Sequence, residues 1–225
     1  MSLKLPKNKM VTVLSLLSAA LILGSGLFLS VATASPGPTI TSECTNHTTV
    51  ANGCSSYVID MSASENIGYS PSVIYVHHGE WITIRDASDI EHTFTLVSPS
   101  VEPHTIAQIN ACDDETPGTV CVNALLAHVP GGVPPTTAPP MPYQNSCYVF
   151  TSPVAYQCVK NGVGLANGSP FPGLKTPFTA TTGGDSVVLF PGESFMVQVT
   201  APAGTVLHFM CVIHPWMQGE IVVTN

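Results

Sequence analysis

The residues best suited to chemistry lie near the C-terminus, where a thiol, an imidazole and a thioether occur within one short segment. They are Cys211, His214 and Met217, and Pro215 among them favours a tight turn. Such a turn can bring the three donor atoms to one point. A thiolate, two imidazoles and a weak axial thioether are the ligands of an electron-transfer copper site.

A second imidazole is needed to complete that set, and His92 is the best candidate. It follows a polar, turn-rich stretch at 85–89 and opens an expected strand at 92–97, as a ligand near the rim of a β-sandwich should. The sequence therefore predicts one copper ion held by His92, Cys211, His214 and Met217.

The other histidines are less suited to a ligand role. His77 and His78 lie in an expected turn and are predicted to be solvated. His208 precedes Cys211 by three residues, so strand alternation directs it to the opposite face. The histidines at positions 47, 104 and 128 fall in loop or insertion sequence and are expected to be exposed.

The seven cysteines indicate an exported protein with one thiol to spare. Six fall into neighbouring pairs, which predicts three local disulfides, although six cysteines allow 15 pairings. The candidates are Cys44 with Cys54, Cys112 with Cys121, and Cys147 with Cys158. Cys211 is left over, and an unpaired cysteine in an exported protein needs another role, such as binding a metal.

Short apolar segments bounded by turns predict the elements that position these residues. They lie at 57–61, 71–76, 81–84, 92–97, 186–190, 195–199, 206–210 and 221–223. Many short strands without a clear helix predict an all-β fold, an antiparallel β-sandwich. The segment from about 98 to 185 differs: it is rich in Gly, Pro and Thr, carries four cysteines, and shows only a weak helical period near 120–129. We expect it to be a long, disulfide-stapled insertion within one domain at 35–225.

The N-terminal segment predicts export. Lys4, Lys7 and Lys9 precede an uncharged apolar run to about Ala34, which is typical of a signal peptide but also long enough for a membrane anchor. Both readings of residues 1–34 stay open, and both place the body outside the cytoplasm. The body has three basic residues against all 14 acidic ones, a net charge of −11, which excludes nucleic acid as a partner.

The motif Cys-x-x-His-Pro-x-Met at 211–217 resembles the copper loop of plastocyanin-like cupredoxins, and its short spacing is most similar to amicyanin. Segments 69–80 and 189–195 resemble the early strand and the hairpin before the copper strand of that family. The resemblance covers roughly 57–97 and 186–225. It implies a Greek-key β-sandwich, a type 1 copper site and redox partner proteins.

Three further residues follow from the resemblance. The family usually has an asparagine before the first histidine ligand, where it ties the ligand loops together; Asp86 occupies that place here. The resemblance also implies that the ring edge of His214 reaches the surface. Pro215 and Trp216 beside it are then candidates for the surface where a redox partner docks, with plain packing as the alternative for Trp216.

Three functions are compatible with this site. The first is extracytoplasmic one-electron transfer without catalysis. The second is copper delivery or storage, which the same four residues would serve. The third is a copper enzyme, which needs a further copper cluster with an open position and more histidines than the sequence groups together.

Overall fold

The computed structural model describes residues 57–62, 68–132, 146–151 and 154–225. The predicted leader at 1–34 and the Cys44–Cys54 pair lie outside these ranges. Within them, no helix combines the length and the apolar character needed to cross a bilayer.

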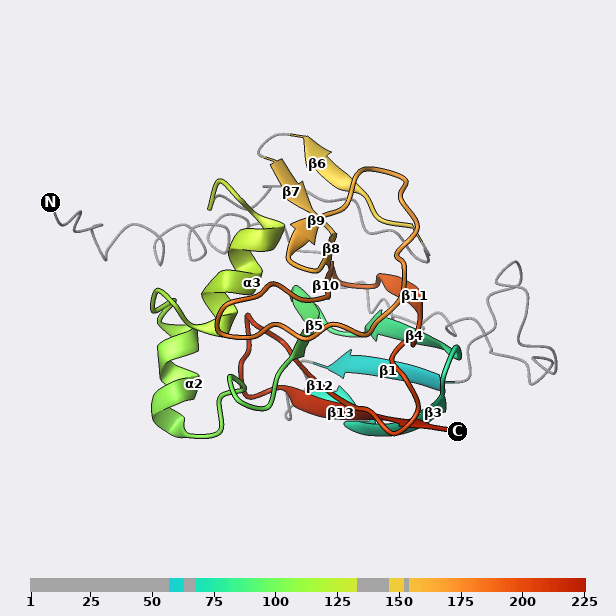
Figure 1. The fold of residues 1–225 in the computed structure, drawn as a ribbon. Helices are drawn as coiled ribbons and strands as arrows, with labels where there is room; N and C mark the ends of the chain where they lie inside the picture. The colour runs from blue at the N-terminus through green and yellow to red at the C-terminus, as the bar shows by residue number, and fades with distance from the viewer. Residues whose placement is uncertain (1–56, 63–67, 133–145, 152–153) are drawn as a thin grey trace, which may run out of the picture. The chain divides into compact units, whose positions relative to one another are not determined.

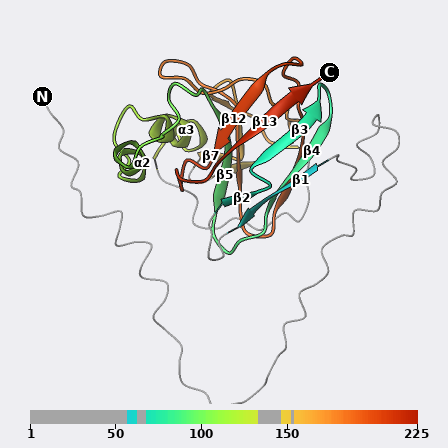
Figure 2. The same cartoon turned by 90° about the horizontal axis from the view of Figure 1, so that it is seen from below.

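Two facing β-sheets form the body, as predicted (Figures 1 and 2). The smaller sheet has the order β11-β4-β1-β2 and the larger one β3-β13-β12-β5-β10-β8-β9. The smaller sheet contains β1 (Tyr57–Ser62), β2 (Gly68–Ser70), β4 (Trp81–Asp86) and β11 (Ser194–Gln198). The larger one contains β3 (Val73–His77), β5 (His92–Val97), β8 (Cys158–Lys160), β9 (Val163–Gly164), β10 (Ser186–Leu189), β12 (Val206–Met210) and β13 (Gln218–Thr224).

Most strand pairs are antiparallel, but two are parallel. β1 pairs with β4, and β3 pairs with β13 in the same direction. Neither pair is joined by a single turn: β2 and β3 come between β1 and β4 in the sequence, and β3 is far along the chain from β13. The turn residues in the sequence therefore could not predict the direction of these pairings.

The space between the sheets is filled by the inward-facing side chains of both. Ile82 and Ile84 of β4 are fully buried, and so are Phe94 of β5 and Phe209 of β12. The rings of Phe94 and Phe209 stack with centroids 4.4 Å apart, and Tyr69 packs edge-on against both. Aromatic contacts of this kind contribute about 0.5–1.5 kcal/mol beyond the area they bury, so they stabilise the packing between β5 and β12.

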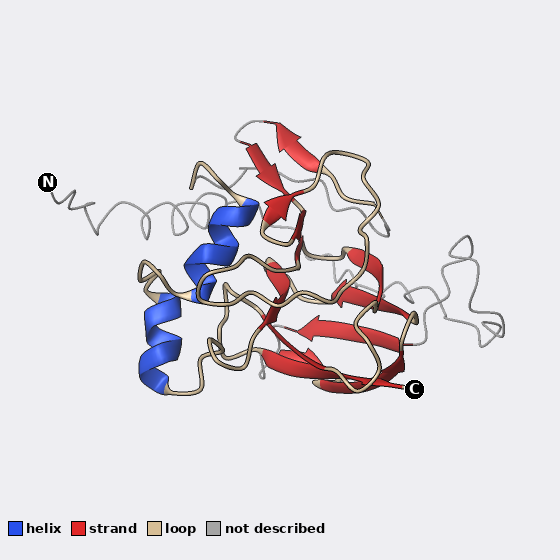
Figure 3. Cartoon of the chain, in the orientation of Figure 1, coloured by secondary structure: helices blue, strands red, loops and turns tan. Residues whose placement is uncertain are grey.

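The segment 98–185 connects β5 to β10, and its two helices lie to one side of the strands (Figure 2). It contains α2 (Ile106–Asp113), α3 (Val120–His128) and the hairpin of β6 (Val149–Thr151) and β7 (Val154–Tyr156), and it adds β8 and β9 to the larger sheet. Figure 3 shows α2 and α3 as helices beside the strands. The weak helical period at 120–129 is confirmed as α3, whereas α2 was not predicted.

Two of the predicted disulfides are present in this segment. Cys112 is bonded to Cys121, which joins α2 to α3, and Cys147 is bonded to Cys158 at the start of β8. Disulfides persist in proteins outside the cytoplasm. Among the described cysteines Cys211 alone is free, as the odd count predicted.

Candidate metal centre

The pairing of β5 with β12 explains why residues 119 positions apart meet. The two strands are antiparallel, with Met210 opposite Thr95 and His208 opposite Val97. The first residue of β5, His92, therefore lies at the same rim of the sandwich as the residue that follows β12, Cys211. The hairpin between β12 and β13 then returns the chain through His214 and Met217.

Three donor atoms converge at this rim. Cys211 Sγ lies 3.7 Å from Nδ1 of His92 and 3.6 Å from Nδ1 of His214, and the two Nδ1 atoms are 3.1 Å apart. Among the described residues these three form the one group of histidine, cysteine and acidic side chains close enough to hold a metal ion. A point in their plane at equal distance from the three atoms lies about 2 Å from each, close to ordinary metal–nitrogen and metal–sulfur bond lengths.

The protonation states of the group suit a cation. Burial, and then the neighbouring His214, lowers the pKa of His92 to about 4. Burial also lowers the pKa of His214. Both imidazoles are therefore neutral at pH 7 and direct lone pairs at the same point as the sulfur. Burial raises the pKa of the Cys211 thiol, and hydrogen bonds from Thr93 lower it; metal binding would displace its proton.

Met217 lies in the buried core next to this group. Its side chain is 1% exposed and belongs to the same apolar cluster as Cys211. Its backbone N–H donates to His214 O, and its carbonyl accepts from Cys211 N. These two backbone hydrogen bonds close the short loop and hold its three side chains in place relative to one another.

The exposure of the loop is uneven. His92 and Cys211 are fully buried, whereas His214 is half-buried and its ring contacts Trp216, with centroids 5.5 Å apart. Trp216 is 46% exposed, but Pro215 is buried. Of the two residues predicted for a docking surface, only Trp216 is available to a partner. Pro215 instead turns the chain inward, where its carbonyl accepts from the Gln218 amide.

Asp86 does not contact the ligand loop through any hydrogen bond of its side chain. Its Oδ1 accepts from the backbone and hydroxyl of Ser88, and burial raises its pKa to about 6. The tie between the ligand segments comes from Thr93, whose backbone N–H lies 3.4 Å from Cys211 Sγ and whose hydroxyl accepts from Val212 N at 2.9 Å. The place of Asp86 in the sequence does not show this arrangement, because its carboxylate bonds Ser88, two residues away, and not the ligand loop.

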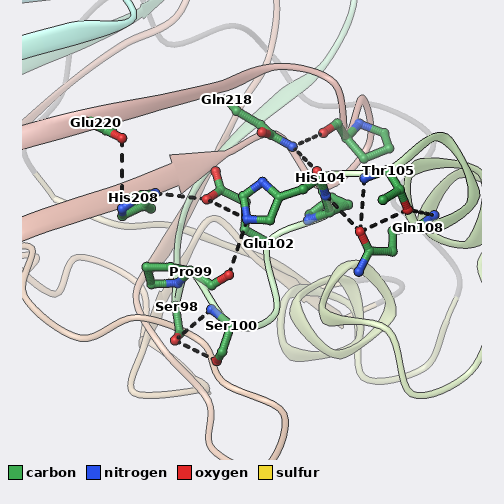
Figure 4. A network of polar contacts seen from close by, with 12 residues as sticks. Ser98, Pro99, Ser100, Glu102, His104, Thr105, Gln108, His208, Gln218 and Glu220 are labelled. Atoms are coloured by element: carbon green, nitrogen blue, oxygen red, sulfur yellow. Dashed lines mark hydrogen bonds and ion pairs between the residues drawn. The ribbon is translucent and has the colours of Figure 1, made fainter.

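The segment 98–185 braces both strands that carry the loop (Figure 4). Its buried Glu102 accepts a hydrogen bond from Nδ1 of His208 on β12 at 2.8 Å. Gln218, the first residue of β13, donates its amide to the carbonyl of Pro103 at 2.7 Å. His208 therefore faces the insertion, and His104, with 57% of its side chain exposed, is solvated as predicted.

His128 contradicts its predicted exposure. It ends α3 and is 3% exposed, with Nδ1 2.6 Å from the carbonyl of Tyr156 and Nε2 2.7 Å from the hydroxyl of Ser186. Burial is the main reason that its pKa falls to about 4. The sequence predicts exposure because His128 is a polar residue at the end of a short apolar helix. It is buried because α3 packs against β7 and β8, which are distant in sequence.

The buried state of His128 predicts a pH-dependent stability. Between pH 6.5 and about 4 the unfolded chain protonates this side chain and the folded protein does not, so its stabilising contribution is present above pH 6.5 and is lost as pH falls. Relative to His128→Gln, we expect the metal-free wild type to lose about 2 kcal/mol of unfolding free energy between pH 7 and pH 5. Urea unfolding of both proteins at pH 7 and pH 5 measures this loss. The prediction is wrong if the two proteins differ in unfolding free energy by the same amount at both pH values.

Comparison with known proteins finds distant similarity to solved structures. No family model and no curated protein matches it. Similar solved structures include reduced auracyanin from Roseiflexus castenholzii (19% identity, 77% of this chain and 100% of that chain, TM-score 0.37). A purple cupredoxin from Nitrosopumilus maritimus (10% identity, 75% and 99%, TM-score 0.34) and plastocyanin from Dryopteris crassirhizoma (14% identity, 74% and 98%, TM-score 0.30) also match.

Likenesses this distant carry no argument about function, and the fold stands on the strands of this chain. Its two sheets face each other, β5 and β12 are neighbours, and the histidine–cysteine–histidine group lies where β5 begins and β12 ends. The β-sandwich predicted from the sequence is thereby confirmed, with the histidine–cysteine–histidine group at one rim of it.

Proposed function

We propose that this protein is an extracytoplasmic one-electron carrier whose single copper ion is bound by His92, Cys211, His214 and Met217. The observation that carries the proposal is the convergence of two neutral imidazole nitrogens and one sulfur, all within 3.7 Å of one another. Two nitrogens, one sulfur and a weak axial thioether are the donor set of an electron-transfer copper site.

The chain's own residues account for each requirement of such a carrier. Copper supplies one-electron redox chemistry when bound. The buried His92 and Cys211 exclude water from one side, and the backbone ties among Cys211, His214 and Met217 hold the loop in one shape. Three strong donors and one weak donor leave no position for a substrate, so we do not propose an enzyme.

The partly exposed edge of His214 gives electrons a route to a partner protein. The ring is half-buried and packs against the exposed indole of Trp216, so this apolar spot is the place where a redox partner would dock. The disulfides and the apolar N-terminal segment support a location outside the cytoplasm, either secreted or attached to a membrane through residues 1–34.

Copper titration of the purified protein tests the proposal. We expect one copper per chain, an intense thiolate-to-copper absorption in the visible range and an electron paramagnetic resonance spectrum typical of a type 1 site. His92→Gln should lose that absorption, whereas His104→Gln, which alters an exposed imidazole, should retain it. A weak, tetragonal copper spectrum in the wild type would reject the assignment, and two or more coppers per chain would favour an enzyme.

Copper delivery or storage would use the same ligands, and a separate measurement distinguishes it. An electron carrier retains copper through repeated oxidation and reduction. Rapid loss of copper to a chelator, together with a reduction potential outside the range of any plausible partner, would favour delivery over electron transfer.

A further inference from the structure

The helix α2 lies beside the ligand loop and is exposed on almost all sides. We propose that α2 and Trp216 together form one docking surface, and that its occupant is a redox protein with positive charge around its own exposed cofactor. This inference rests on the proposed electron-transfer function and names the chemistry of the partner. The surface consists of Ile106, Asp113, Asp114, Glu115 and Trp216, and we call it the docking face.

Two contacts hold α2 alongside the ligand loop. Near the start of the helix, the amide of Gln218 donates to the carbonyl of Pro103 at 2.7 Å and to that of Pro215 at 2.9 Å (Figure 4). Near the end of the helix, Cys112 belongs to the same small apolar cluster as Val212 of the loop. Figures 1 and 2 show α2 on the side of the sandwich to which the loop between β12 and β13 extends. The helix therefore lies next to the loop near both of its ends.

The helix α2 exposes apolar surface that its own packing does not use. Ile106 begins the helix and is 78% exposed, the largest value among the big apolar side chains in the described part of the chain. Cys112 is the one residue that α2 buries. A helix of eight residues is not stable in water by itself, and here a capping box between Thr105 and Gln108 and the disulfide to α3 hold it. The helix is thus formed before a partner arrives, so docking on it requires little further ordering.

The end of α2 carries three negative charges. Asp113, Asp114 and Glu115 are all exposed, and no ion pair joins any of them to another residue within the described ranges. The last turn of the helix contains no basic residue. Carboxylates at this end lie near the negative end of the helix dipole, which is unfavourable for the helix. The stability of α2 therefore does not account for these charges.

The negative charge acts on the metal centre as well. Burial lowers the pKa of His214, and the charge of Asp113 partly offsets that effect. The ligand loop itself, residues 211–218, contains no lysine, arginine or acidic residue. The docking face therefore combines an uncharged loop with an acidic edge.

Charge decides which partner fits the docking face. The body has a net charge of −11, so a second copy of this chain or another acidic protein would be repelled. A protein with lysine and arginine side chains around its cofactor is attracted and oriented by the three carboxylates. The apolar Ile106 and Trp216 then supply contact area. Because Trp216 packs against the His214 ring, a partner seated there lies next to the ligand through which electrons leave.

Electron transfer from the reduced, copper-loaded protein to a basic cytochrome c tests the inference. One variant carries Asp113→Asn, Asp114→Asn and Glu115→Gln together, which keeps the size of each side chain and removes three charges. We expect its second-order rate constant at low ionic strength to fall about tenfold, with a weaker dependence on salt. Ile106→Ser should lower the rate constant about threefold at every salt concentration, because it removes apolar contact and no charge.

Two controls separate docking from damage to the metal centre. Reduction of hexacyanoferrate(III), a small anion, should become faster in the triple variant, since the three carboxylates repel it in the wild type. Slower reduction of both oxidants would instead indicate a damaged centre and overturn the inference. Val163→Ser alters an apolar side chain that is 67% exposed in β9, and it should leave the rate with the cytochrome unchanged.

A measurement on the metal-free protein tests the docking face without copper. Addition of the basic cytochrome c should shift the nuclear magnetic resonance signals of the Trp216 indole N–H and of the α2 amides. If the wild type binds no copper, the proposed function fails, and unshifted α2 signals would overturn the docking face independently. If copper is bound but the triple variant reacts with the cytochrome at the wild-type rate, the docking face is overturned and the copper function stands.

Discussion

Replacing Cys211 with serine is expected to abolish the visible absorption of the copper-loaded protein and to weaken copper binding more than about a hundredfold. The sulfur is the only soft anionic donor in the group, and its thiolate is the origin of the charge-transfer band. A serine hydroxyl keeps its proton at neutral pH and offers a hard oxygen instead. Loss of an outer partner of a metal ligand already costs about 10–100-fold in affinity, so loss of the ligand itself should cost more.

Met210→Leu is the matched control for this substitution. Met210 immediately precedes Cys211, is fully buried and conserves its volume on replacement by leucine, but it belongs to the other apolar cluster and contributes no donor atom. Absorption spectra and a competition titration against a copper chelator compare the three proteins. If Cys211→Ser keeps an intense visible band, the sulfur is not a ligand and the copper proposal fails.

The part of the site that lies in one segment could be predicted from sequence, because residues so close along the chain are held near one another by the loop itself. Cys211, His214 and Met217 lie in one tight hairpin, so any fold that closes the hairpin brings them together. His92 was predicted from its place at the start of a strand, which is a weaker signal. It needed the antiparallel pairing of β5 with β12 to become a neighbour of Cys211.

The parts that could not be predicted depend on contacts between distant segments. The helix α2 buries only Cys112, so its sequence carries no apolar period. The burial of His128 depends on Ser186 and on the carbonyl of Tyr156, which are 58 and 28 residues away. Thr93, and not Asp86, makes the hydrogen bond that ties the two ligand segments together. The Asp86 carboxylate instead accepts from the Ser88 hydroxyl.

The segment 98–185 is attached to the sandwich at several points. Glu102 binds His208, the amide of Gln218 binds the carbonyl of Pro103, and the hydroxyl of Tyr148 donates to the buried Glu193 at 2.7 Å. The first two attachments hold β12 and β13, between which the ligand loop lies. The insertion therefore acts as a brace for the site, and the contacts that hold the insertion itself together should be important for stability.

Asp185 holds parts of the insertion together next to β10, and Asp185→Ala is expected to lower the free energy of unfolding by about 3–5 kcal/mol, the usual cost of leaving one partner of a buried ion pair alone. The Asp185 carboxylate is fully buried and accepts from Lys160 Nζ at 2.6 Å. It also accepts from three backbone N–H groups, those of residues 161, 175 and 176. Alanine would remove the acceptor of these three N–H groups and leave the lysine charge, which is only 10% exposed, with the carbonyl of Gly173 in place of a carboxylate.

Asp60→Ala provides a matched comparison, because Asp60 also pairs with a basic side chain, here Arg85 at 2.7 Å, but in a setting where 31% and 39% of the two side chains are exposed. Exposed pairs contribute about 0–1 kcal/mol. Urea unfolding of both variants in the metal-free state therefore compares the same chemistry with and without burial. Equal losses would show that the buried contacts of Asp185 are not decisive for the stability of the insertion. A large loss for Asp185→Ala alone, partly restored in Asp185→Asn because its amide oxygen still accepts from the backbone, would show that burial makes this pair decisive.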